Sequence, residues 1–283
     1  MQHAFAHCEA LVRAADRDRF LATLFAPRER RGALFALYAF NVEVARIREQ
    51  AHQPMPGEIR LQWWRDVFGG IGQGEARANP VAAALLETAV RYRLPPRGFT
   101  ELIDARAFDL YDEPMGSFHE LDGYATKISS SLIELATRIL NDGNDPRIEK
   151  LAGPAGIAYA VAGLLTAFPL HAARRQLFVP LDVLQRHGAR PDDVFAGKAT
   201  SELHATLAET RAHARAHLAE AKALIAYAPA ALAPALLPAA LVRPTLDRMD
   251  RSGHDPFKPA ALPQWRRQWI LWRAARSGLA HAL

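Results

Sequence analysis

The chain of 283 residues is 50% hydrophobic, which is enough apolar material for a sizeable core and excludes disorder over the length of a domain. Its 35 Lys and Arg against 30 Asp and Glu give a net charge of +5, which is compatible with an anionic partner but does not identify one. The lone Cys8 has no partner for an internal disulfide or a thiolate metal cage, so the sequence favours a reducing compartment.

Helix signals dominate the N-terminal third of the chain. Residues 1–21 lack a basic region followed by an uninterrupted apolar core, so we expect a first helix here, not a signal peptide or a membrane span. A second helix is predicted from Pro27 to Ile47, and residues 52–57 form the loop that ends it. Glu58 to Phe68 predicts a third helix, which the two glycines that follow it close.

Three further helices are predicted before residue 141. Residues 70–79 are expected to form a loop, and Pro80 to Tyr92, rich in Ala and Leu, a helix. Arg97 to Tyr111 forms the next one, after a pair of prolines. Ser117 to Leu140 is expected to be one long helix that begins with a capping box, a serine with a glutamate three residues later.

A buried helix that ends in a cationic cluster is predicted next. Large apolar residues recur at helical spacing from Ile157 to Phe168, and Pro169 then kinks or ends the helix. If helical geometry resumes, the spacing of His171, Arg174 and Arg175 places them on one face, where they suit an anion or an acidic partner. The residues alone favour the alternative of a solvated helix end, because basic side chains there complement the helix dipole.

Helices of very different length are predicted after this cluster. Pro180 to His187 forms a short helix, Pro191 begins another turn, and Ser201 to Ala228 forms a long helix. The apolar run from Ala221 to Val242 contains three prolines, so we expect short, kinked core helices here and not a bilayer span.

The C-terminal segment that begins at Pro263 combines tryptophan with arginine. Trp265, Trp269 and Trp272 recur at helical spacing, with arginines between them. Aromatic residues at this period are usually buried, so packing in the core or against a partner is favoured. The alternative is an interfacial membrane anchor.

Acidic side chains three or four residues apart on one helix are the usual means of holding Mg²⁺ against a diphosphate. Glu43 and Glu49 are six residues apart, which does not bring them onto one face. Asp109, Asp112 and Glu113 have the required spacing. However, an acidic cluster with no second acidic cluster to complete the Mg²⁺ site is more typical of a helix end. The sequence therefore predicts no Mg²⁺ site from spacing alone.

His213, His217 and Glu220 also share one face of a predicted helix. This face is either a solvated basic surface or, as the alternative, a zinc-binding site. The glutamate of an HExxH motif is missing because Ala214 follows the first histidine, so we expect no metal. The chain also lacks a phosphate-binding Gly-rich loop, a Gly-x-Ser-x-Gly elbow and zinc-finger spacing. Conventional kinase, hydrolase and zinc-finger classes are excluded, and we expect no nucleic-acid partner.

Four segments, in this order and spacing, resemble the squalene and phytoene synthase family of all-α isoprenoid synthases. They read FALYAFNVEVARIREQ (Phe35 to Gln50), LQWWRD (Leu61 to Asp66), ELIDARAFDL (Glu101 to Leu110) and GLLTAFPLHAARRQLFVPLDVL (Gly163 to Leu184). The resemblance implies a single all-α domain over residues 1–283, an isoprenoid synthase-type helical bundle around a central apolar cavity.

Active members of this family carry an Asp-rich motif in the first segment and another in the fourth, which together bind Mg²⁺ and the diphosphates of two prenyl substrates. The matching positions of the first motif read Ala45, Arg46 and Glu49 here, and those of the second read Ala167 and His171. Losing carboxylate ligands and gaining positive charge disfavours a divalent cation. The resemblance therefore implies a pseudoenzyme that needs no cofactor.

With these replacements, the segments resemble a divergent branch of the family, which contains mitochondrial complex I assembly factor six and its bacterial relatives. The resemblance implies a role in assembly of respiratory NADH dehydrogenase, with a complex I subunit or assembly protein as partner. It also implies a cavity for a prenyl or lipid ligand. We expect a cytoplasmic protein, with peripheral contact to the inner membrane as an option, on the matrix side if the source is organellar.

The residues expected to meet a phosphate or acidic group directly, without Mg²⁺, are basic or polar side chains of the first and fourth segments: Tyr38, Asn41, Arg46, His171, Arg174 and Arg175. The alternative is an active prenyl transferase that condenses farnesyl or geranylgeranyl diphosphate. Its unorthodox Mg²⁺ site would use four carboxylates, Glu43, Glu49, Asp104 and Asp109.

Overall fold

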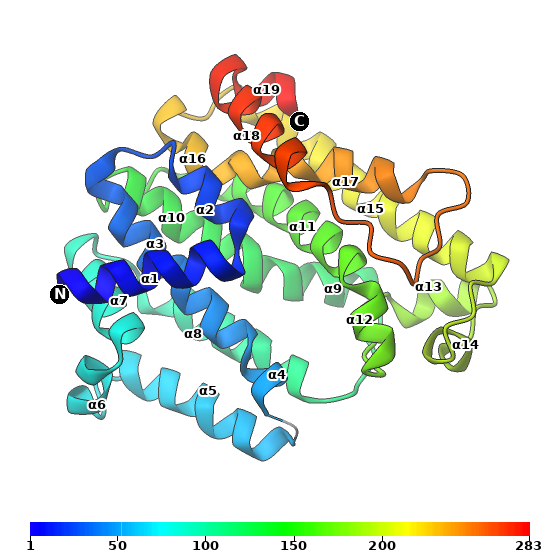
Figure 1. Cartoon of the computed structure of the whole chain (residues 1–283), viewed down its shortest axis with the longest axis horizontal. Helices are drawn as coiled ribbons and strands as arrows, with labels where there is room; N and C mark the ends of the chain where they lie inside the picture. Colours follow the sequence, from blue (N-terminus) through cyan, green and yellow to red (C-terminus); the bar gives the residue numbers. More distant parts are fainter. Residues whose placement is uncertain (52) are drawn as a thin grey trace. The chain divides into compact units, whose positions relative to one another are not determined.

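The computed structural model describes residues 1–51 and 53–283, and every regular element in these two ranges is a helix (Figure 1). The prediction of an all-α fold is therefore confirmed. The described residues pack into two units, each assembled from three separate stretches of the chain. Unit 1 comprises Met1–Tyr111, Ser131–Glu149 and Ala228–Pro238, and unit 2 comprises Asp112–Ser130, Lys150–Tyr227 and Ala239–Leu283.

Unit 1 is organised around one helix, α3. Its elements are α1 (Gln2–Ala15), α2 (Arg17–Thr23), α3 (Arg28–Ala45), α4 (Ile47–Gln50), α5 (Pro54–Phe68), α6 (Gln73–Ala78), α7 (Pro80–Arg91), α8 (Pro96–Ala107), η1 (Phe108–Leu110), α10 (Ser131–Leu140), η3 (Ala230–Leu232) and α16 (Ala233–Leu236). Every residue of α3 from 33 to 42 is buried, and the helix contacts α1, α7, α8 and α10. A helix that is buried on all its faces is typical of a core element.

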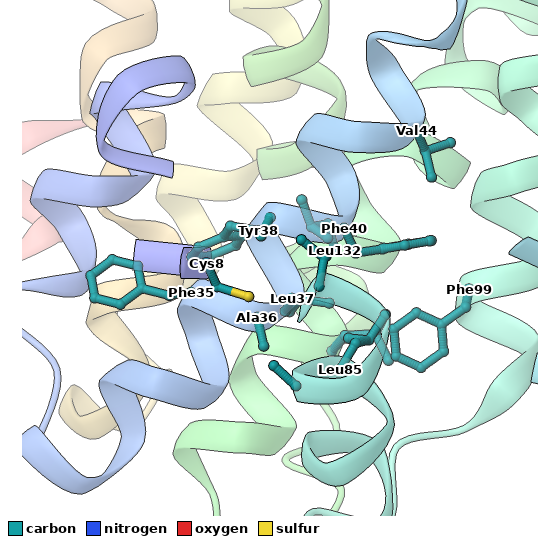
Figure 2. Close-up of a cluster of buried hydrophobic side chains, with 14 of the residues drawn as sticks. Cys8, Phe35, Ala36, Leu37, Tyr38, Phe40, Val44, Leu85, Phe99 and Leu132 are labelled. Atoms are coloured by element: carbon teal, nitrogen blue, oxygen red, sulfur yellow. The ribbon is translucent and has the colours of Figure 1, made fainter. Parts of the chain in front are cut away.

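Aromatic side chains fill the core beside α3 (Figure 2). The ring of Phe40 lies edge-on to Trp64, Phe68 and Phe99, with centroid distances of 4.9, 5.7 and 5.6 Å. Edge-to-face pairs add about 0.5–1.5 kcal/mol each beyond the burial of apolar area. Cys8 of α1 is fully buried in the same cluster, and burial, together with the carboxyl of Glu43, raises the pKa of its thiol to about 12.

Two segments of unit 1 that were expected to be loops contain helix. The helix α5 begins at Pro54, within the expected loop 52–57, because proline is well suited to the first turn of a helix. The helix α6 lies inside the expected loop 70–79, where Gly72, with φ of 66°, precedes a short run of helix-forming residues. Both expectations were wrong because the local glycines and prolines start helices here as well as end them.

Unit 2 holds the apolar helix α11 (Glu149–Thr166), apart from its first residue, and most of the C-terminal half. Its other elements are α9 (Phe118–Ala125), the π-helical η2 (Thr126–Ser130), α12 (Phe168–Ala173), α13 (Leu181–Arg186), α14 (Pro191–Phe195), α15 (Ser201–Ile225), α17 (Val242–Met249), α18 (Gln264–Ser277) and α19 (Leu279–Ala282). The break between α11 and α12 falls at Ala167, and Pro169 lies in the first turn of α12. The predicted interruption at this proline is therefore confirmed.

The long helix predicted from Ser117 to Leu140 is divided into α9, η2 and α10. The Ser117 cap is confirmed, because its Oγ accepts a hydrogen bond from the backbone N–H of Glu120 at 3.3 Å. The π-helical segment lies in close contact with α11, since a Cβ added to Gly156 would lie 2.5 Å from the backbone nitrogen of Ser130. The Oγ of Ser130 also donates a hydrogen bond to the carbonyl of Gly153 at 2.9 Å. This contact is tertiary, so the capping signal in the sequence did not reveal it.

The apolar run that precedes α17 forms the short helices η3, α16 and η4 (Leu237–Leu241), as predicted, and η4 passes from unit 1 into unit 2. Among the described residues, no helix is both long enough and apolar enough to cross a bilayer. In α18, Leu271 and Ala274 are buried, whereas Trp265, Trp269 and Trp272 are 69%, 56% and 43% exposed. Of the two expected environments, packing in the core of this chain is wrong, because the smaller residues on the opposite face of the helix occupy the core; packing against a partner stays a prediction.

Candidate functional site

A cavity of about 390 Å³ opens beside α3 in unit 1 and holds part of the first family-like segment. Residues of α1, α3, α4 and α5, together with Arg46 between α3 and α4, form most of its wall. The polar and aromatic lining residues are His7, Glu43, Arg46, Gln50, Arg60, Trp63, Trp64 and Asn79. Cavities of this size accept small ligands, and a few polar groups in an apolar wall fix how a ligand is oriented.

One carboxyl group, that of Glu43, lines this cavity. Burial raises its pKa, and a hydrogen bond from the Asn79 side chain offsets part of that rise. The Asn79 Oδ1 atom accepts hydrogen bonds from the backbone N–H groups of Val81 and Ala82, both at 2.9 Å, and so caps α7. Its amide nitrogen is therefore the end that donates to Glu43. Glu43 is thus held in place and is easier to protonate than a solvated glutamate.

Arg46 is the residue of this cavity best suited to an anion. It is half-buried at the C-terminal end of α3, and in the part of the chain that the structure describes its guanidinium has no hydrogen-bond or ion-pair partner. Arg60, on the same wall, donates a hydrogen bond to Gln50 at 2.6 Å. A guanidinium presents several donors in a planar fork that matches phosphate and carboxylate oxygens. The cavity therefore combines two guanidinium groups with a single carboxyl group.

The aromatic wall of the cavity comes from LQWWRD, the second family-like segment. The rings of Trp63 and Trp64 lie edge to face at 4.9 Å, and Trp64 also contacts Phe40 in the core. These indoles give a ligand an apolar surface beside the two arginines. The lining therefore suits an amphiphile that carries an anionic group.

Tyr38 and Asn41, also predicted to bind the ligand, lie in the core and are not part of the cavity wall. Tyr38 is buried, which raises the pKa of its hydroxyl, and the guanidinium of Arg19 lies 5.6 Å from its ring centroid. Asn41 is buried, and its Oδ1 atom has no hydrogen-bond partner in the described ranges. The structure thus places one of the three ligand-binding residues predicted on the first segment, Arg46, at the cavity.

His171, Arg174 and Arg175 belong to unit 2 and do not continue one helical face. The helix α12 ends at Ala173, and Arg175 adopts a left-handed conformation with φ of 57°. Its guanidinium lies 4.7 Å from the ring centroid of Phe195. The expectation of a common face was wrong because the helix ends one residue before Arg174.

The side chain of His171 borders a pocket of about 10 Å³ with an otherwise largely apolar wall, and its ring lies 4.6 Å from that of Phe178. A space of this size holds roughly one water molecule at most. Arg174 and Arg175 are exposed. The described environment of His171 is therefore that of a packed histidine.

The four carboxylates of the alternative Mg²⁺ site occupy different environments in unit 1. Glu43 lines the cavity and Glu49 is exposed. Asp104 pairs with Arg65 at 2.8 Å, and Asp109 is buried and pairs with Arg106 at 2.9 Å. Arginine partners satisfy the oxygens that a metal ion would need.

Among the described residues, the group of three potential metal ligands that lie together is Asp122, His213 and His217, in unit 2. Two of these, His213 and His217, were singled out in the sequence together with Glu220, which is exposed and not part of the group. Asp122 was missed because it lies about 90 residues earlier in the chain, on another helix. A spacing rule within one helix has no means of finding it.

Comparison with known proteins agrees with the four family-like segments. The sequence model of the squalene/phytoene synthase family matches residues 12–273. Human NADH dehydrogenase (ubiquinone) complex I, assembly factor 6, is 29% identical over 254 residues, which cover 90% of this chain and 76% of that protein. Phytoene synthase from Thermus thermophilus is 26% identical over 270 residues, which cover 93% of this chain and 90% of the enzyme.

The three-dimensional fold also matches that of a solved synthase structure. A crystal structure of a dehydrosqualene synthase in complex with ligand superimposes with a TM-score of 0.85, at 17% identity, and the match covers 99% of this chain and 98% of that one. This likeness establishes the all-α fold. With the sequence match over residues 12–273, it leads to one conclusion: the chain belongs to the squalene/phytoene synthase family.

Proposed function

We propose that this protein is a squalene/phytoene synthase-like assembly factor for respiratory NADH dehydrogenase, and that it does not condense prenyl diphosphates. The observation that carries the proposal is the guanidinium of Arg46, which lines the cavity without a partner among the described residues. It stands where an active family member is expected to hold a Mg²⁺-binding carboxylate. The similarity to complex I assembly factor 6 supports a role in the assembly of NADH dehydrogenase.

The electrostatics of the cavity favour direct binding of an anion. Two unit charges 4 Å apart interact by about 4 kcal/mol at an effective dielectric of about 20, so Arg46 attracts an anionic phosphate and repels Mg²⁺, whose charge is twice as large. Glu43 offers the only carboxyl group in the described lining, and its pKa is raised. A Mg²⁺ site of the diphosphate type usually needs at least one or two ionised carboxylates together with the substrate phosphates.

The ligand class that fits this cavity is a prenyl or lipid tail with a phosphate or another acidic head group. The head group would meet Arg46 and Arg60, and the tail would lie against Trp63 and Trp64. Such a ligand would be bound without turnover. An acidic segment of a partner protein is the alternative ligand, because its carboxylates would meet the same two arginines.

The decisive experiment is a deletion of the gene in the source organism, scored for assembly of NADH dehydrogenase and for isoprenoid content. Wild-type protein should restore assembly, Arg46→Ala should fail, and the exposed Arg77→Ala should serve as the matched control. Isoprenoid content should stay constant throughout. A loss of isoprenoids on deletion, or Mg²⁺-dependent release of diphosphate from farnesyl diphosphate by the purified protein, would establish the prenyl transferase instead.

A second candidate function, contact with an anionic membrane surface, rests on α18. Three tryptophans of this helix are exposed, and the helix contains four arginines and no acidic residue. The guanidinium of Arg276 lies 5.2 Å from the ring centroid of Trp272, which itself stacks on Trp269 at 5.2 Å. Tryptophan beside arginine is typical of helices that lie in the headgroup region of a bilayer. We propose that α18 makes this peripheral contact.

A further inference from the structure

A cluster of imidazole and carboxylate groups joins α9 to α15 in unit 2. The Nε2 atom of His213 lies 2.7 Å from Oδ1 of Asp122, and the Nε2 atom of His217 lies 3.3 Å from Oδ2 of the same carboxylate. The ligand atoms of the three residues all lie within 4.8 Å of one another. We infer that Asp122, His213 and His217 form a binding site for a divalent transition-metal ion of the zinc class.

The donor set fits such an ion. Two imidazoles and one carboxylate are a recurrent ligand set for zinc and for other first-row metals, with further positions left to water. Metal–ligand distances of about 2.0–2.2 Å place tetrahedral ligand atoms about 3.4 Å apart. The separation of 2.7 Å between His213 and Oδ1 of Asp122 needs to open by several tenths of an ångström, and that of 3.3 Å between His217 and Oδ2 already matches. A rotation of the Asp122 carboxylate supplies a change of this size. Because the imidazoles face different oxygens, one ion reaches all three residues when the carboxylate binds it through both oxygens or turns one of them toward it.

The two histidines are fixed before a metal arrives. They are four residues apart on the 25-residue helix α15, so they project from the same face, and their ring centroids lie 4.7 Å apart. The ring of Phe118 stacks on His213 at 4.0 Å, which fixes the plane of that imidazole. Ligands held by rigid elements lose little entropy on binding.

The two arginines nearest to the histidines on α15 are paired with carboxylates. The neighbouring arginines of α15, Arg211 and Arg215, form ion pairs with Asp250, and Arg215 also pairs with Asp247. Their positive charge is therefore compensated at sites other than Asp122. All three ligand side chains are partly exposed, which leaves a path for the metal and room for a bound water.

The competing explanation is a hydrogen-bonded His–Asp–His cluster that binds no metal. It predicts that replacing Asp122 by asparagine, which still accepts and donates hydrogen bonds, leaves the Zn²⁺ affinity of the protein unchanged. A metal site predicts a large effect, because asparagine is neutral and a weaker ligand for zinc. The site lies wholly in unit 2, whereas Arg46 belongs to unit 1, so failure of this inference leaves the proposed assembly role untouched.

The test is titration of the untagged full chain with Zn²⁺ in competition with a chromophoric chelator, followed by Co²⁺ substitution. Wild-type protein should bind one ion per chain, and the Co²⁺ form should show the visible absorption of a low-symmetry nitrogen and oxygen site. His213→Ala, His217→Ala and Asp122→Asn should each weaken Zn²⁺ binding at least tenfold. His204→Ala, which removes an exposed imidazole from the same helix, should leave the affinity unchanged.

The melting temperature gives a second readout. Zn²⁺ should raise it in wild-type protein and in His204→Ala, but not in Asp122→Asn, because an ion that binds only the folded state stabilises it. If an alanine variant does not fold, Asp122→Asn decides the matter. Equal Zn²⁺ affinities for wild-type and Asp122→Asn, or no Zn²⁺ binding by the wild type, would leave a cluster that is only hydrogen-bonded and overturn the inference.

Discussion

The packing of α11 against η2 yields a stability prediction with a control inside the same helix. A methyl group added in Gly156→Ala would lie 2.3 Å from Oγ of Ser130 and 2.5 Å from both its Cα and its backbone nitrogen. Carbon atoms in van der Waals contact are about 3.5–4.0 Å apart, so the backbone of one helix must move. Overpacking of this kind costs up to about 3 kcal/mol, and alanine regains about 1 kcal/mol of helix propensity. The expected net destabilisation is about 2 kcal/mol.

Gly163→Ala, in the same helix, is the matched control, because no atom beyond its chain neighbours and the backbone of its own helix lies within 4 Å of the added methyl group. It should stabilise the protein by up to about 1 kcal/mol. The two variants should therefore differ by about 3 kcal/mol, or about 6–12 °C in melting temperature for a chain of this size. Thermal and urea unfolding followed by circular dichroism measure both quantities. Equal stability of the two variants would show that the close approach of α11 to Ser130 does not constrain the fold.

Three further predictions concern the cavity and α18. Arg46→Ala should weaken the binding of inorganic diphosphate at least tenfold, because a hydrogen bond to a charged group contributes about 1.5–3 kcal/mol. Calorimetry measures this affinity, with Arg77→Ala as the control. Equal affinities for the two variants would exclude Arg46 from the site. Burial raises the pKa of Glu43, so its contribution to stability is complete below its unfolded pKa and is lost as the pH rises through the folded value. Glu43→Gln should therefore raise the melting temperature more at pH 7 than at pH 4, and a gain confined to pH 4 would contradict this sign. Trp269→Ala should reduce co-sedimentation with vesicles of anionic phospholipid, whereas Tyr227→Ala, which removes an even more exposed aromatic side chain outside α18, should not. Identical loss in both variants would count against a membrane contact through α18.

The sequence predicted those parts of the fold that depend on local chemistry. Pro169 ends α11 because its ring clashes one turn back, and Ser117 caps α9 through its own hydroxyl. The π-helical segment η2 could not be predicted in this way, because it coincides with a glycine of α11 about 30 residues further along the chain. The exposed face of α18 was missed for a related reason. Periodicity indicates that Trp265 and Trp269 share a face, but not which face of the helix the rest of the protein covers.

The candidate site was predictable only in part. Arg46 followed from the comparison of its segment with the Asp-rich motif of the family, and the structure places it in the cavity. Arg60 and Asn79 were missed, because neither belongs to a recognisable motif and each reaches the cavity through tertiary packing. Of the carboxylates proposed for the alternative Mg²⁺ site, Asp109 pairs with Arg106 three residues earlier, whereas Asp104 pairs with Arg65, which is 39 residues away and belongs to another helix. The pair of Asp109 could therefore be read from its spacing, but that of Asp104 could not, because charge pairing across helices has no signature in the spacing of a single helix.

The burial of Cys8 makes the only thiol of the chain a natural probe of opening in unit 1. Because its pKa is raised to about 12, very little of the thiol is ionised at pH 7, so reagents that attack the thiolate should react very slowly with the folded protein. Its neighbour in sequence, His7, lines the cavity, and so does Glu43, whose charge acts on the thiol. A molecule that fills the cavity should hold α1 in place and slow the labelling of Cys8 further. The rate of this one reaction would thus report occupancy of the cavity without a label and without knowing in advance what the ligand is.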